Sequence, residues 1–407
     1  MRVLMLAQFY APIIGGEERM AETMATALAE RGHELAVATL RQPGQDSYEE
    51  IAGVPVHRLG GLAQRVPGLF SEPGRRHAPP LGDPETVAGL RRLLRDLRPD
   101  IVHTHNWLDH AYLPLAPRSD AAFVISLHDY SLICANKRLI RVDDPCSGPA
   151  PAKCRACAAN QYGRLSGPVI ATLVRRSERR RRALADRMLP ISRYVAERCG
   201  LPGGSTPWEV MPNFLTGDGR AATGGSGLDL PDGAFIQFAG DLTTDKGVHV
   251  LLHAYGELDA APPLVMIGRP IDVDPETVPD GVTVCGPVPH ADVLAAWERC
   301  TVAVVPSLQP EAFGVVALEA MRAGKPVIAA RSGGLPEVVE HERSGLLVEP
   351  GDAGSLRDAL ERVLGDDALR RTLSEGARLR AAQFTGEQVV PRLEQAYETA
   401  IEHRRAR

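Results

Sequence analysis

The sequence predicts an α/β protein of two domains, and three observations lead to this prediction. The chain has 407 residues, of which 44% are hydrophobic, so it is long and apolar enough for two packed cores. Short apolar runs, typical of buried parallel strands, alternate with helical stretches in both halves. Glycine-containing loops join several of these strands to the next helix. We therefore expect two β/α domains with ligand sites at the carboxyl ends of their strands.

Charge and cysteine content exclude several classes of protein. The net charge of −5 gives no general reason to expect nucleic acid as a partner. No apolar run reaches the roughly 18 residues that span a bilayer, and the apolar start is interrupted at Gln8, too early for a signal peptide. Seven cysteines, an odd number, fit a reducing compartment better than a disulfide framework. We therefore expect a cytoplasmic protein.

The chain opens with a strand, a glycine loop and a helix. The run RVLMLA predicts a buried strand, and Gly15 and Gly16 then lead into a helix that reaches Arg31. A glycine-rich turn from strand to helix is a phosphate-binding geometry, because the backbone amides at the helix start stay free for an anion. The alternative interpretation is an ordinary tight turn.

Histidines follow two later strands of the first half. His103 and His105 alternate along a predicted strand at 101–105, so they face the same direction. A second strand, 123–127, ends directly before His128. A neutral imidazole at that position can hydrogen-bond a hydroxyl, and its cation can stabilise negative charge. Each histidine can also be a hydrogen-bonded structural residue.

Two carboxylates flank a turn in the second half. The run VAVV at 302–305 predicts a strand, a helix opens at Gly314, and the next strand follows at 326–330. These elements form a βαβ unit, and such sheets bind ligands beyond the carboxyl ends of their strands. Glu311 and Glu319 are therefore expected at the mouth of a binding crevice.

The start of this helix offers groups that suit a nucleotide sugar. Phe313, Gly314 and Val315 present backbone amides to an anion such as a diphosphate. Glu319 can accept hydrogen bonds from the two neighbouring hydroxyls of a ribose, and Glu311 can do the same for a sugar. The alternative is a pair of solvated carboxylates, which are common on protein surfaces.

Three segments resemble the GT4 family of retaining glycosyltransferases, which have the GT-B fold. Residues 306–348 carry, in order, spaced glutamates, FG, EAM-x-x-G-x-PV and GG-x-x-E. The N-terminal pattern P-x-x-GG-x-E, followed by a helix and RGHE-x-x-V, is similar to the start of GT4 chains, and LHDYSLIC at 127–134 resembles a family pattern as well. The resemblance spans most of the chain.

The resemblance implies an architecture. GT-B proteins have two Rossmann-like domains that face each other across a cleft. We expect an N-terminal acceptor-side domain at 1–205 and a C-terminal nucleotide-sugar-binding domain at 206–385. The last segment, 386–407, is expected to be a helix that crosses back to the first domain.

The resemblance also implies roles for individual residues. Glu311 would contact the transferred sugar, Glu319 the nucleotide ribose, and His128 would lie beside the transferred sugar. The loop at Gly15 and Gly16 would lie against the donor phosphates and the acceptor. The residues expected to shape the acceptor pocket are His105, Asn106 and Trp107. The candidates for catalysis are His128, Glu311 and Lys246.

One position departs from the family pattern. The family has Gly-Arg where this chain has Gly240 and Asp241, and it has Lys where this chain has Lys246; the two cations hold the diphosphate. An Asp at this position would repel phosphate unless it points away or makes another contact. Arg269, on a neighbouring loop, is the candidate for the missing positive charge.

Four of the seven cysteines fall within 24 positions. Cys154 and Cys157 have the C-x-x-C spacing that lets two thiolates bind one Zn²⁺, and Cys134 and Cys146 can complete a tetrahedron. The chain between them is rich in turn residues and would gain order from a structural zinc. The alternative is a set of free thiols in a loop.

A basic stretch, Arg175–Arg182, is expected to be helical. It predicts either a solvated helix face or a surface for an anionic acceptor or a peripheral membrane contact. Two further stretches, 71–84 and 217–227, are rich in small and turn-forming residues and are expected to be loops, the first of them mobile.

The predicted function is transfer of a sugar from a nucleotide diphosphate sugar to a hydroxyl of a natural product, glycan or lipid, with retention implied by the resemblance. We expect no catalytic metal, because cations and helix dipoles would neutralise the diphosphate. Alternatives are a nucleotide-sugar epimerase or hydrolase of the same fold, and a non-catalytic binding homologue, which Asp241 favours. A dinucleotide dehydrogenase fits less well, because no G-x-G-x-x-G follows the first strand.

Overall fold

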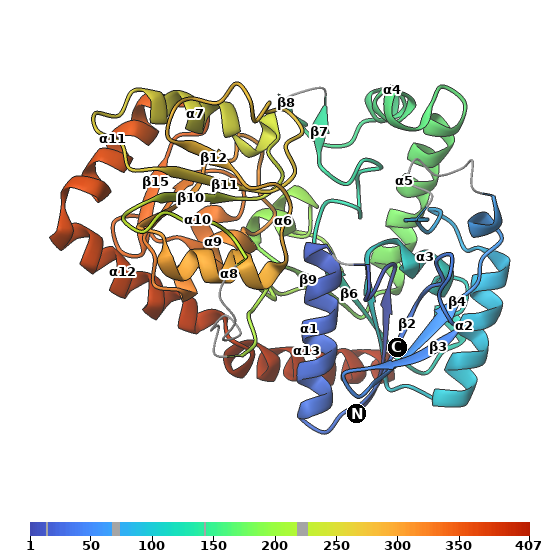
Figure 1. Ribbon diagram of the computed structural model, residues 1–407. Coiled ribbons are helices and arrows are strands. Elements are labelled where there is room, and N and C mark those ends of the chain that lie inside the picture. The colour runs from blue at the N-terminus through green and yellow to red at the C-terminus, as the bar shows by residue number, and fades with distance from the viewer. Residues whose placement is uncertain (14, 67–73, 142–143, 218–226) are drawn as a thin grey trace. The chain divides into compact units, whose positions relative to one another are not determined.

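The structure, a computed structural model, describes residues 1–13, 15–66, 74–141, 144–217 and 227–407 (Figure 1). The chain divides into two compact units. Unit 1 comprises Met1–Val142, Cys146–Pro212 and Gly386–Arg407, and unit 2 comprises Asp143–Pro145 and Asn213–Thr385. Of the two predicted loops, residues 71–73 and 218–226 lie outside the described residues, and 74–83 form no helix or strand.

Unit 1 contains a seven-stranded sheet in the order β3-β4-β2-β1-β5-β6-β9. All of its neighbouring strands are parallel except β3, which runs antiparallel to β4. The central strands are buried along nearly their whole length, which explains their continuous apolar sequences. The strands are β1 (Arg2–Ala7), β2 (Glu34–Leu40), β3 (Tyr48–Ile51), β4 (Val54–Leu59), β5 (Ile101–His105), β6 (Ala122–Leu127) and β9 (Arg187–Pro190).

Helices of unit 1 follow the sheet strands and pack on them. In one group, α1 (Gly16–Glu30) and α13 (Gly386–Ala406) contact each other, and α13 also contacts β6. In another, α2 (Pro84–Leu97) contacts α3 (Asp109–Tyr112) and β4. The remaining helices are α4 (Pro151–Tyr162), α5 (Ser166–Leu184) and α6 (Arg193–Arg198), and short strands stand at β7 (Ile140–Arg141) and β8 (Asp144–Pro145).

Residues 206–212 belong to unit 1, although we expected them to open the second domain. Backbone hydrogen bonds explain the difference, because this segment runs alongside β9. Met188 donates to the carbonyl of Pro207 at 2.9 Å, and Met211 donates to that of Pro190 at 2.9 Å. The last helix, α13, also belongs to unit 1, where Tyr397 is fully buried.

Unit 2 contains a six-stranded, fully parallel sheet in the order β12-β11-β10-β13-β14-β15. Its strands are short and mostly buried on both faces, as expected for a sheet covered by helices. The strands are β10 (Ile236–Ala239), β11 (Leu264–Ile267), β12 (Val282–Val284), β13 (Val302–Val305), β14 (Val327–Ala330) and β15 (Gly345–Val348).

Helices cover both faces of the unit 2 sheet. In Figure 1, α7 (Val248–Gly256) and α11 (Ala353–Gly365) lie above the strands and contact each other. On the opposite face, α9 (Val315–Arg322) contacts α8 (His290–Arg299) and α12 (Asp367–Ala381). A one-turn helix, α10 (Leu335–Val338), follows β14. Among the described residues, no helix is both long enough and apolar enough to cross a membrane.

Glu394 ties α13 to the end of α1 within unit 1. Its carboxylate accepts two hydrogen bonds of 2.8 Å from the guanidinium of Arg31 and one of 2.8 Å from Nε2 of His33. The hydrogen bonds from Arg31 are the largest influence on the pKa of Glu394, which falls to about 2. The last helix is therefore held to unit 1 by charge as well as by its buried apolar face.

We expect Glu394→Gln to lower the free energy of unfolding by about 1 kcal/mol at pH 7, because it removes the charge from a bidentate pair. The contribution is complete above the ordinary carboxyl pKa of about 4.3 and is lost as the pH falls toward about 2. Urea unfolding at several pH values measures it. Glu398→Gln, at an exposed position of the same helix, is the matched control; equal losses in the two variants would contradict this role of Glu394.

Candidate active site

The unit 2 sheet has a topological switch point between β10 and β13. From β10 the chain order proceeds outward to β11 and β12, and from β13 it proceeds the other way to β14 and β15. Lys246 follows β10 and Glu311 follows β13, so the two residues lie at the carboxyl edge on either side of this point. In open α/β sheets this is where ligands bind.

Lys246 and Glu311 form an ion pair. Nζ of Lys246 donates to Oε1 of Glu311 at 2.6 Å, and the hydroxyl of the buried Ser307 donates to the same oxygen at 2.7 Å. Burial acts to raise the pKa of Glu311, but the charge and hydrogen bonds of Lys246, with that of Ser307, outweigh it and lower the pKa. Glu311 is therefore a carboxylate at neutral pH.

The loops that carry this ion pair are interlocked through their backbones. The carbonyl of Asp245 accepts hydrogen bonds from the amides of Leu308 at 3.0 Å and Gln309 at 3.2 Å. Gly247 has a φ of 76°, and a Cβ there would lie 2.0 Å from the carbonyl oxygen of Pro306. Only glycine permits this approach, so the contact fixes Lys246 against the loop of Glu311.

Gly333 and Gly334, from the GG-x-x-E motif, support the Glu311 loop from the other side. Gly333 has a φ of 62°, and a Cβ there would lie 2.1 Å from the carbonyl oxygen of Glu311. The amide of Gly334 donates to the same oxygen at 2.8 Å. A Cβ on Gly334 would lie 2.6 Å from the carbonyl oxygen of Ala312. The motif thus positions the carboxylate indirectly, by letting a neighbouring loop approach it.

The start of α9 has the geometry that we expected for an anion site. Gly314 caps the helix with a φ of 105°, and a Cβ there would collide with Leu335 at 2.5 Å. The side chain of Phe313 packs edge-on against Phe384, with ring centroids 5.7 Å apart, so it is the backbone of Phe313 that a ligand would contact. The amides of Phe313, Gly314 and Val315 stand at the positive end of the helix dipole.

Glu319 lies in α9 with a side chain that is only 4% exposed. Nε2 of His290, at the start of α8, lies 2.8 Å from Oε1 of Glu319. His290 was not among the residues predicted from the sequence. Its position at the start of a helix that follows a strand is nevertheless the same kind of signal for a ligand site as that of Gly314. A ribose bound to Glu319 would therefore lie beside an imidazole as well.

Asp241 and Arg269 form a bidentate ion pair at the ends of β10 and β11. Nε of Arg269 lies 3.0 Å from one carboxylate oxygen of Asp241, and Nη2 lies 2.6 Å from the other. Gly268 has a φ of 150°, and a Cβ there would lie 1.9 Å from the carbonyl oxygen of Gly240. Because glycine has no Cβ, the two strand ends can lie this close together. Asp241 thus makes another contact, which is one of the two ways in which an aspartate was expected to be tolerated here. Its partner, Arg269, is the cation predicted from the sequence.

In unit 1, the predicted histidines gather at the carboxyl ends of β5 and β6. Nδ1 of His105 lies 2.7 Å from Nε2 of His128, and the two rings are stacked at 5.0 Å. Burial lowers the pKa of His128 to about 4. Burial, with the charges of His103 and His128, lowers the pKa of His105 well below its ordinary value. Both rings are therefore neutral at pH 7. Nδ1 of His128 has no hydrogen-bond partner among the described residues.

His103 has a structural role. Its Nδ1 lies 2.7 Å from the hydroxyl of Tyr397, and its Nε2 lies 2.8 Å from that of Ser126. Burial is the main reason why the pKa of His103 falls to about 3. Its ring lies 4.3 Å from that of His105, so the two histidines share a face of the strand as predicted.

Asn106 joins a network that the sequence analysis only partly identified. Its Nδ2 donates to Glu17 at 2.6 Å, and its Oδ1 accepts from Lys137 at 2.5 Å. The ammonium of Lys137 also lies 4.5 Å from the centre of the Trp107 ring. Trp107 itself is 4% exposed, and its indole donates to the carbonyl of Ser131 at 3.2 Å. Trp107 thus lines the network from the core.

Glu17, Lys137 and Asp129 are the functional candidates that the sequence analysis missed. Burial, followed by the charge of Asp129, raises the pKa of Glu17 to about 8. Burial lowers the pKa of Lys137, against the opposing effects of Asp129 and Glu17. Both Asn106 and Lys137 adopt left-handed backbone conformations, with φ of 59° and 62°. The only available signal was the rarity of lysine, of which the chain has residues at 137, 153, 246 and 325.

The Gly15 and Gly16 loop follows β1, which lies next to β5 at the switch point of the unit 1 sheet. A Cβ on Gly15 would lie 2.4 Å from a carboxylate oxygen of Glu18. Glu18 accepts a hydrogen bond of 2.8 Å from Arg75, whose guanidinium lies 4.9 Å from the centre of the Phe9 ring. The glycine loop is thus bordered by an ion pair.

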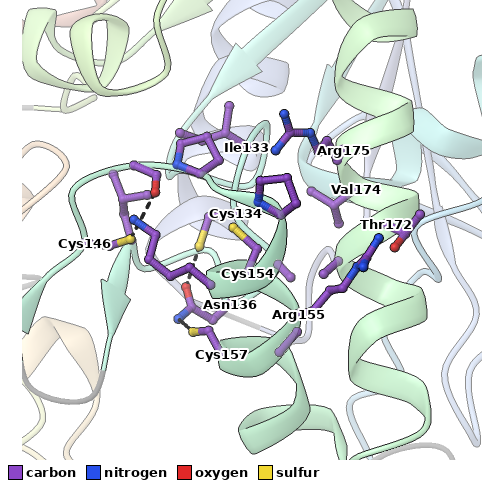
Figure 2. A pocket seen from close by; sticks show the side chains of 18 of the residues that line it. Ile133, Cys134, Asn136, Cys146, Cys154, Arg155, Cys157, Thr172, Val174 and Arg175 are labelled. Carbon is purple, nitrogen blue, oxygen red and sulfur yellow. Dashed lines mark hydrogen bonds between the residues drawn. The ribbon is translucent and has the colours of Figure 1, made fainter.

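The four clustered cysteines lie together in unit 1, where they line one cavity (Figure 2). All four are free thiols. Within the part of the chain that the structure describes, no three His, Cys, Asp or Glu side chains are already arranged as a metal site.

The basic stretch Arg175–Arg182 lies in α5, as predicted. Its members do not all face solvent, because Arg181 is 1% exposed and pairs with the buried Asp109 at 3.3 Å. Arg175, Arg176, Arg179 and Arg180 are exposed. A surface for an anionic acceptor or a membrane therefore stays a prediction for these four residues.

The sequence matches two glycosyltransferase family models and several curated glycosyltransferases. Residues 15–213 match the model of the glycosyl transferase 4-like domain, and residues 228–380 match that of the glycosyl transferases group 1. A D-inositol 3-phosphate glycosyltransferase of Catenulispora acidiphila is 31% identical over 79% of this chain and 77% of its own. A glycogen synthase of Mycobacterium tuberculosis is 27% identical over 98% of this chain and 94% of its own.

Solved structures show the same fold over nearly the whole chain. Sucrose-phosphate synthase from Thermosynechococcus elongatus superposes with a TM-score of 0.74 at 22% identity and covers 98% of both chains. Anabaena HepE in complex with UDP-glucose superposes with a TM-score of 0.69 at 17% identity and covers 98% of this chain and 100% of its own.

We expect Gly333→Ala to lower the free energy of unfolding by about 2 kcal/mol, because alanine is strained at this φ and its Cβ would displace the Glu311 loop. Chemical denaturation followed by tryptophan fluorescence measures the change. Gly365→Ala is the matched control, since Gly365 ends α11 with open space around it. A loss for Gly333→Ala no larger than that of the control would show that the loop does not depend on this approach.

We expect the ring of His128 to stay neutral from pH 8 down to about pH 5, because burial lowers its pKa to about 4. It should bind a proton only as the pH falls toward that value. Nitrogen-15 NMR of histidine-labelled protein, assigned with His128→Gln, follows this titration directly. A midpoint near the ordinary value of about 6.5 would contradict the buried, neutral pair with His105.

Proposed function

This chain belongs to the GT4 family of glycosyltransferases, and on that premise we propose that it transfers a sugar from a nucleotide diphosphate sugar to an acceptor hydroxyl with retention of anomeric configuration. The observation that carries the proposal is the Lys246–Glu311 ion pair at the switch point of unit 2. A cation and a carboxylate at one crevice fit the two halves of such a donor, its charged diphosphate and its hydroxyl-rich sugar.

The diphosphate is the leaving group, and its negative charge grows as the bond to the anomeric carbon breaks. Lys246, Arg269 and the amides at the start of α9 are the positive groups at this edge of the sheet. Fixed donors that face developing charge lower a reaction barrier most when water is excluded. These groups therefore take the part of a catalytic metal, and we expect none.

Glu311 and Glu319 hold the neutral parts of the donor. When phosphate attracts Lys246, the carboxylate of Glu311 becomes free to accept hydrogen bonds from the transferred sugar. Glu319, paired with His290, accepts from the ribose hydroxyls. The low pKa of Glu311 keeps it an acceptor throughout the physiological range.

Unit 1 supplies neutral polar groups for the sugar and the acceptor. The unpartnered Nδ1 of His128 hydrogen-bonds a hydroxyl of the transferred sugar. Asn106, held by Glu17 and Lys137, contributes to the acceptor side. In the retaining reaction, the bond from the anomeric carbon to the diphosphate breaks, the bond to the acceptor oxygen forms, and a leaving phosphate oxygen takes the acceptor proton.

The relatives guide the choice of substrates. The structures similar to this chain include complexes with UDP, UDP-glucose and ADP, which supports a nucleotide-sugar donor. The names of the relatives include an inositol phosphate and glycogen, so acceptors as different as a cyclitol phosphate and a polysaccharide belong in the search. A natural product or lipid acceptor is tested beside them.

Nucleotide diphosphate release tests the proposal. UDP-, GDP-, ADP- and dTDP-sugars are offered with and without candidate acceptors. We expect Glu311→Gln and Lys246→Ala each to lower kcat/KM by about 100-fold or more, because each removes a charge from the donor crevice. Lys325→Ala is the matched control, since Lys325 lies two residues before β14, at the opposite end of the strands.

The outcomes of this assay separate the candidate functions. Release that rises with an acceptor, and product with retained anomeric configuration by NMR, support the transferase. Equal turnover without any acceptor favours a hydrolase or an epimerase. Donor binding by calorimetry without turnover for any acceptor would favour a non-catalytic homologue.

We expect Arg269→Ala to weaken binding of the nucleotide diphosphate about tenfold, because it removes a cation and leaves Asp241 to repel phosphate. The double variant Arg269→Ala with Asp241→Asn should recover part of this affinity. Isothermal titration calorimetry measures both. If Arg269→Ala binds donor as well as the wild type does, Arg269 does not replace the arginine that the family has at the position of Asp241.

A further inference from the structure

The cysteine cluster of unit 1 lies outside the groups assigned to transfer. Its four members come from three segments: Cys134 follows β6, Cys146 follows β8, and Cys154 and Cys157 are on α4. They line one cavity of about 170 Å³ (Figure 2). Cys154 and Cys157, three positions apart, are neighbours on the surface of the helix. The fold thus keeps the four thiols around one cavity.

Hydrogen bonds and the shared cavity show that the sulfurs lie in one region of the unit. Sγ of Cys134 lies 2.7 Å from Oδ1 of Asn136, and Nδ2 of the same amide lies 3.6 Å from Sγ of Cys157. Asn136 therefore separates two of the thiols. Cys146 and Cys154 line the same cavity as these two thiols.

One of the four sulfurs accepts a hydrogen bond from the backbone. The backbone amide of Ala150 donates to Sγ of Cys154 at 3.3 Å, from the turn that precedes α4. Hydrogen bonds of this kind orient and stabilise ligands from outside the metal shell. The fold thus supplies a donor for a thiolate at this position.

The charges around the cavity also suit a tetrathiolate site. Four thiolates and one Zn²⁺ carry a net charge of about −2. The side chains that line the cavity include the basic residues Arg141, Lys153, Arg155, Arg175, Arg176 and Arg179. These positive charges offset the net negative charge of a zinc tetrathiolate. Without the metal, four thiolates in the same space would repel one another.

The helix that carries two of the cysteines buries few of its own side chains. Of the twelve residues of α4, only Ala158 is buried. In the described part of the chain between β6 and α4, the regular elements are the two-residue strands β7 and β8. A metal cross-link would therefore add order to a helix that is held mainly by its contact with α5.

We propose that Cys134, Cys146, Cys154 and Cys157 bind one Zn²⁺ as a structural site that fixes the segment from Cys134 through α4 to unit 1. Zinc with four cysteine thiolates is tetrahedral and closed, so no position is left for a substrate. Binding requires the Asn136 amide to leave its place between Cys134 and Cys157, and the side chains to turn inward. Four thiol protons are released to solvent as the metal binds.

Metal analysis of the full-length, untagged protein, purified without chelator from zinc-supplemented medium, tests the proposal. We expect about one zinc per chain by inductively coupled plasma mass spectrometry. Cys157→Ser should lower the zinc content about tenfold or more. Cys285→Ser is the matched control, since Cys285 is a free, half-buried thiol of unit 2, and it should keep the zinc.

The wild-type protein alone can overturn the proposal, so the test does not depend on whether the variants fold. Substitution with Co²⁺ should give the intense visible bands of a tetrahedral cobalt thiolate. Four thiols that react freely with Ellman's reagent after incubation with zinc would contradict the site. Disulfides between these cysteines in the non-reduced peptide map, or one iron per chain in place of zinc, would contradict it as well.

Discussion

The donor site proposed for unit 2 depends on the ion pair between Lys246 and Glu311. Each residue follows a different strand of the unit 2 sheet, and they meet because the strand order reverses between β10 and β13. The contact requires three glycines, because a side chain at any of these positions would push the loops apart. Gly247 admits the carbonyl of Pro306, and Gly333 and Gly334 admit the Glu311 loop. A charged donor that attracts Lys246 would release Glu311 for the sugar, so the pair holds both residues in place before the donor binds.

The two units differ in the ionisation of the side chains at the carboxyl edges of their sheets. The carboxyl edge of unit 2 has ionised pairs, Lys246 with Glu311 and Arg269 with Asp241. At the corresponding edge of unit 1, burial lowers the pKa of His105 and His128 and raises that of Glu17 to about 8, so these three groups favour their neutral forms, although the Glu18–Arg75 ion pair borders the glycine loop there. This division suits a transfer in which the charge stays with the diphosphate while the sugar and the acceptor hydroxyl are neutral.

Sequence predicted the strands, the glycine turns and the residues at strand ends, because periodicity and turn chemistry are local. The strand Ile101–His105 has the bounds that the pattern predicted. The partners of these residues could not be predicted in this way. Glu17 and Asn106 are 89 positions apart, and Lys246 and Glu311 are 65 apart, so only the strand order brings them together. The boundary after residue 205 failed to include the pairing of 206–212 with β9, which is also a long-range feature.

Hydrogen exchange measured by mass spectrometry, with and without a panel of nucleotide diphosphate sugars, tests the central claim most directly. We expect one class of donor to protect the backbone amides at 240–247 and at 306–319 from exchange. These segments are the two loops of the ion pair and the start of α9. The free sugar and the nucleoside without phosphates should protect these segments far less. Protection that falls elsewhere, or none with any donor, would contradict the assignment of this edge of unit 2 as the donor site.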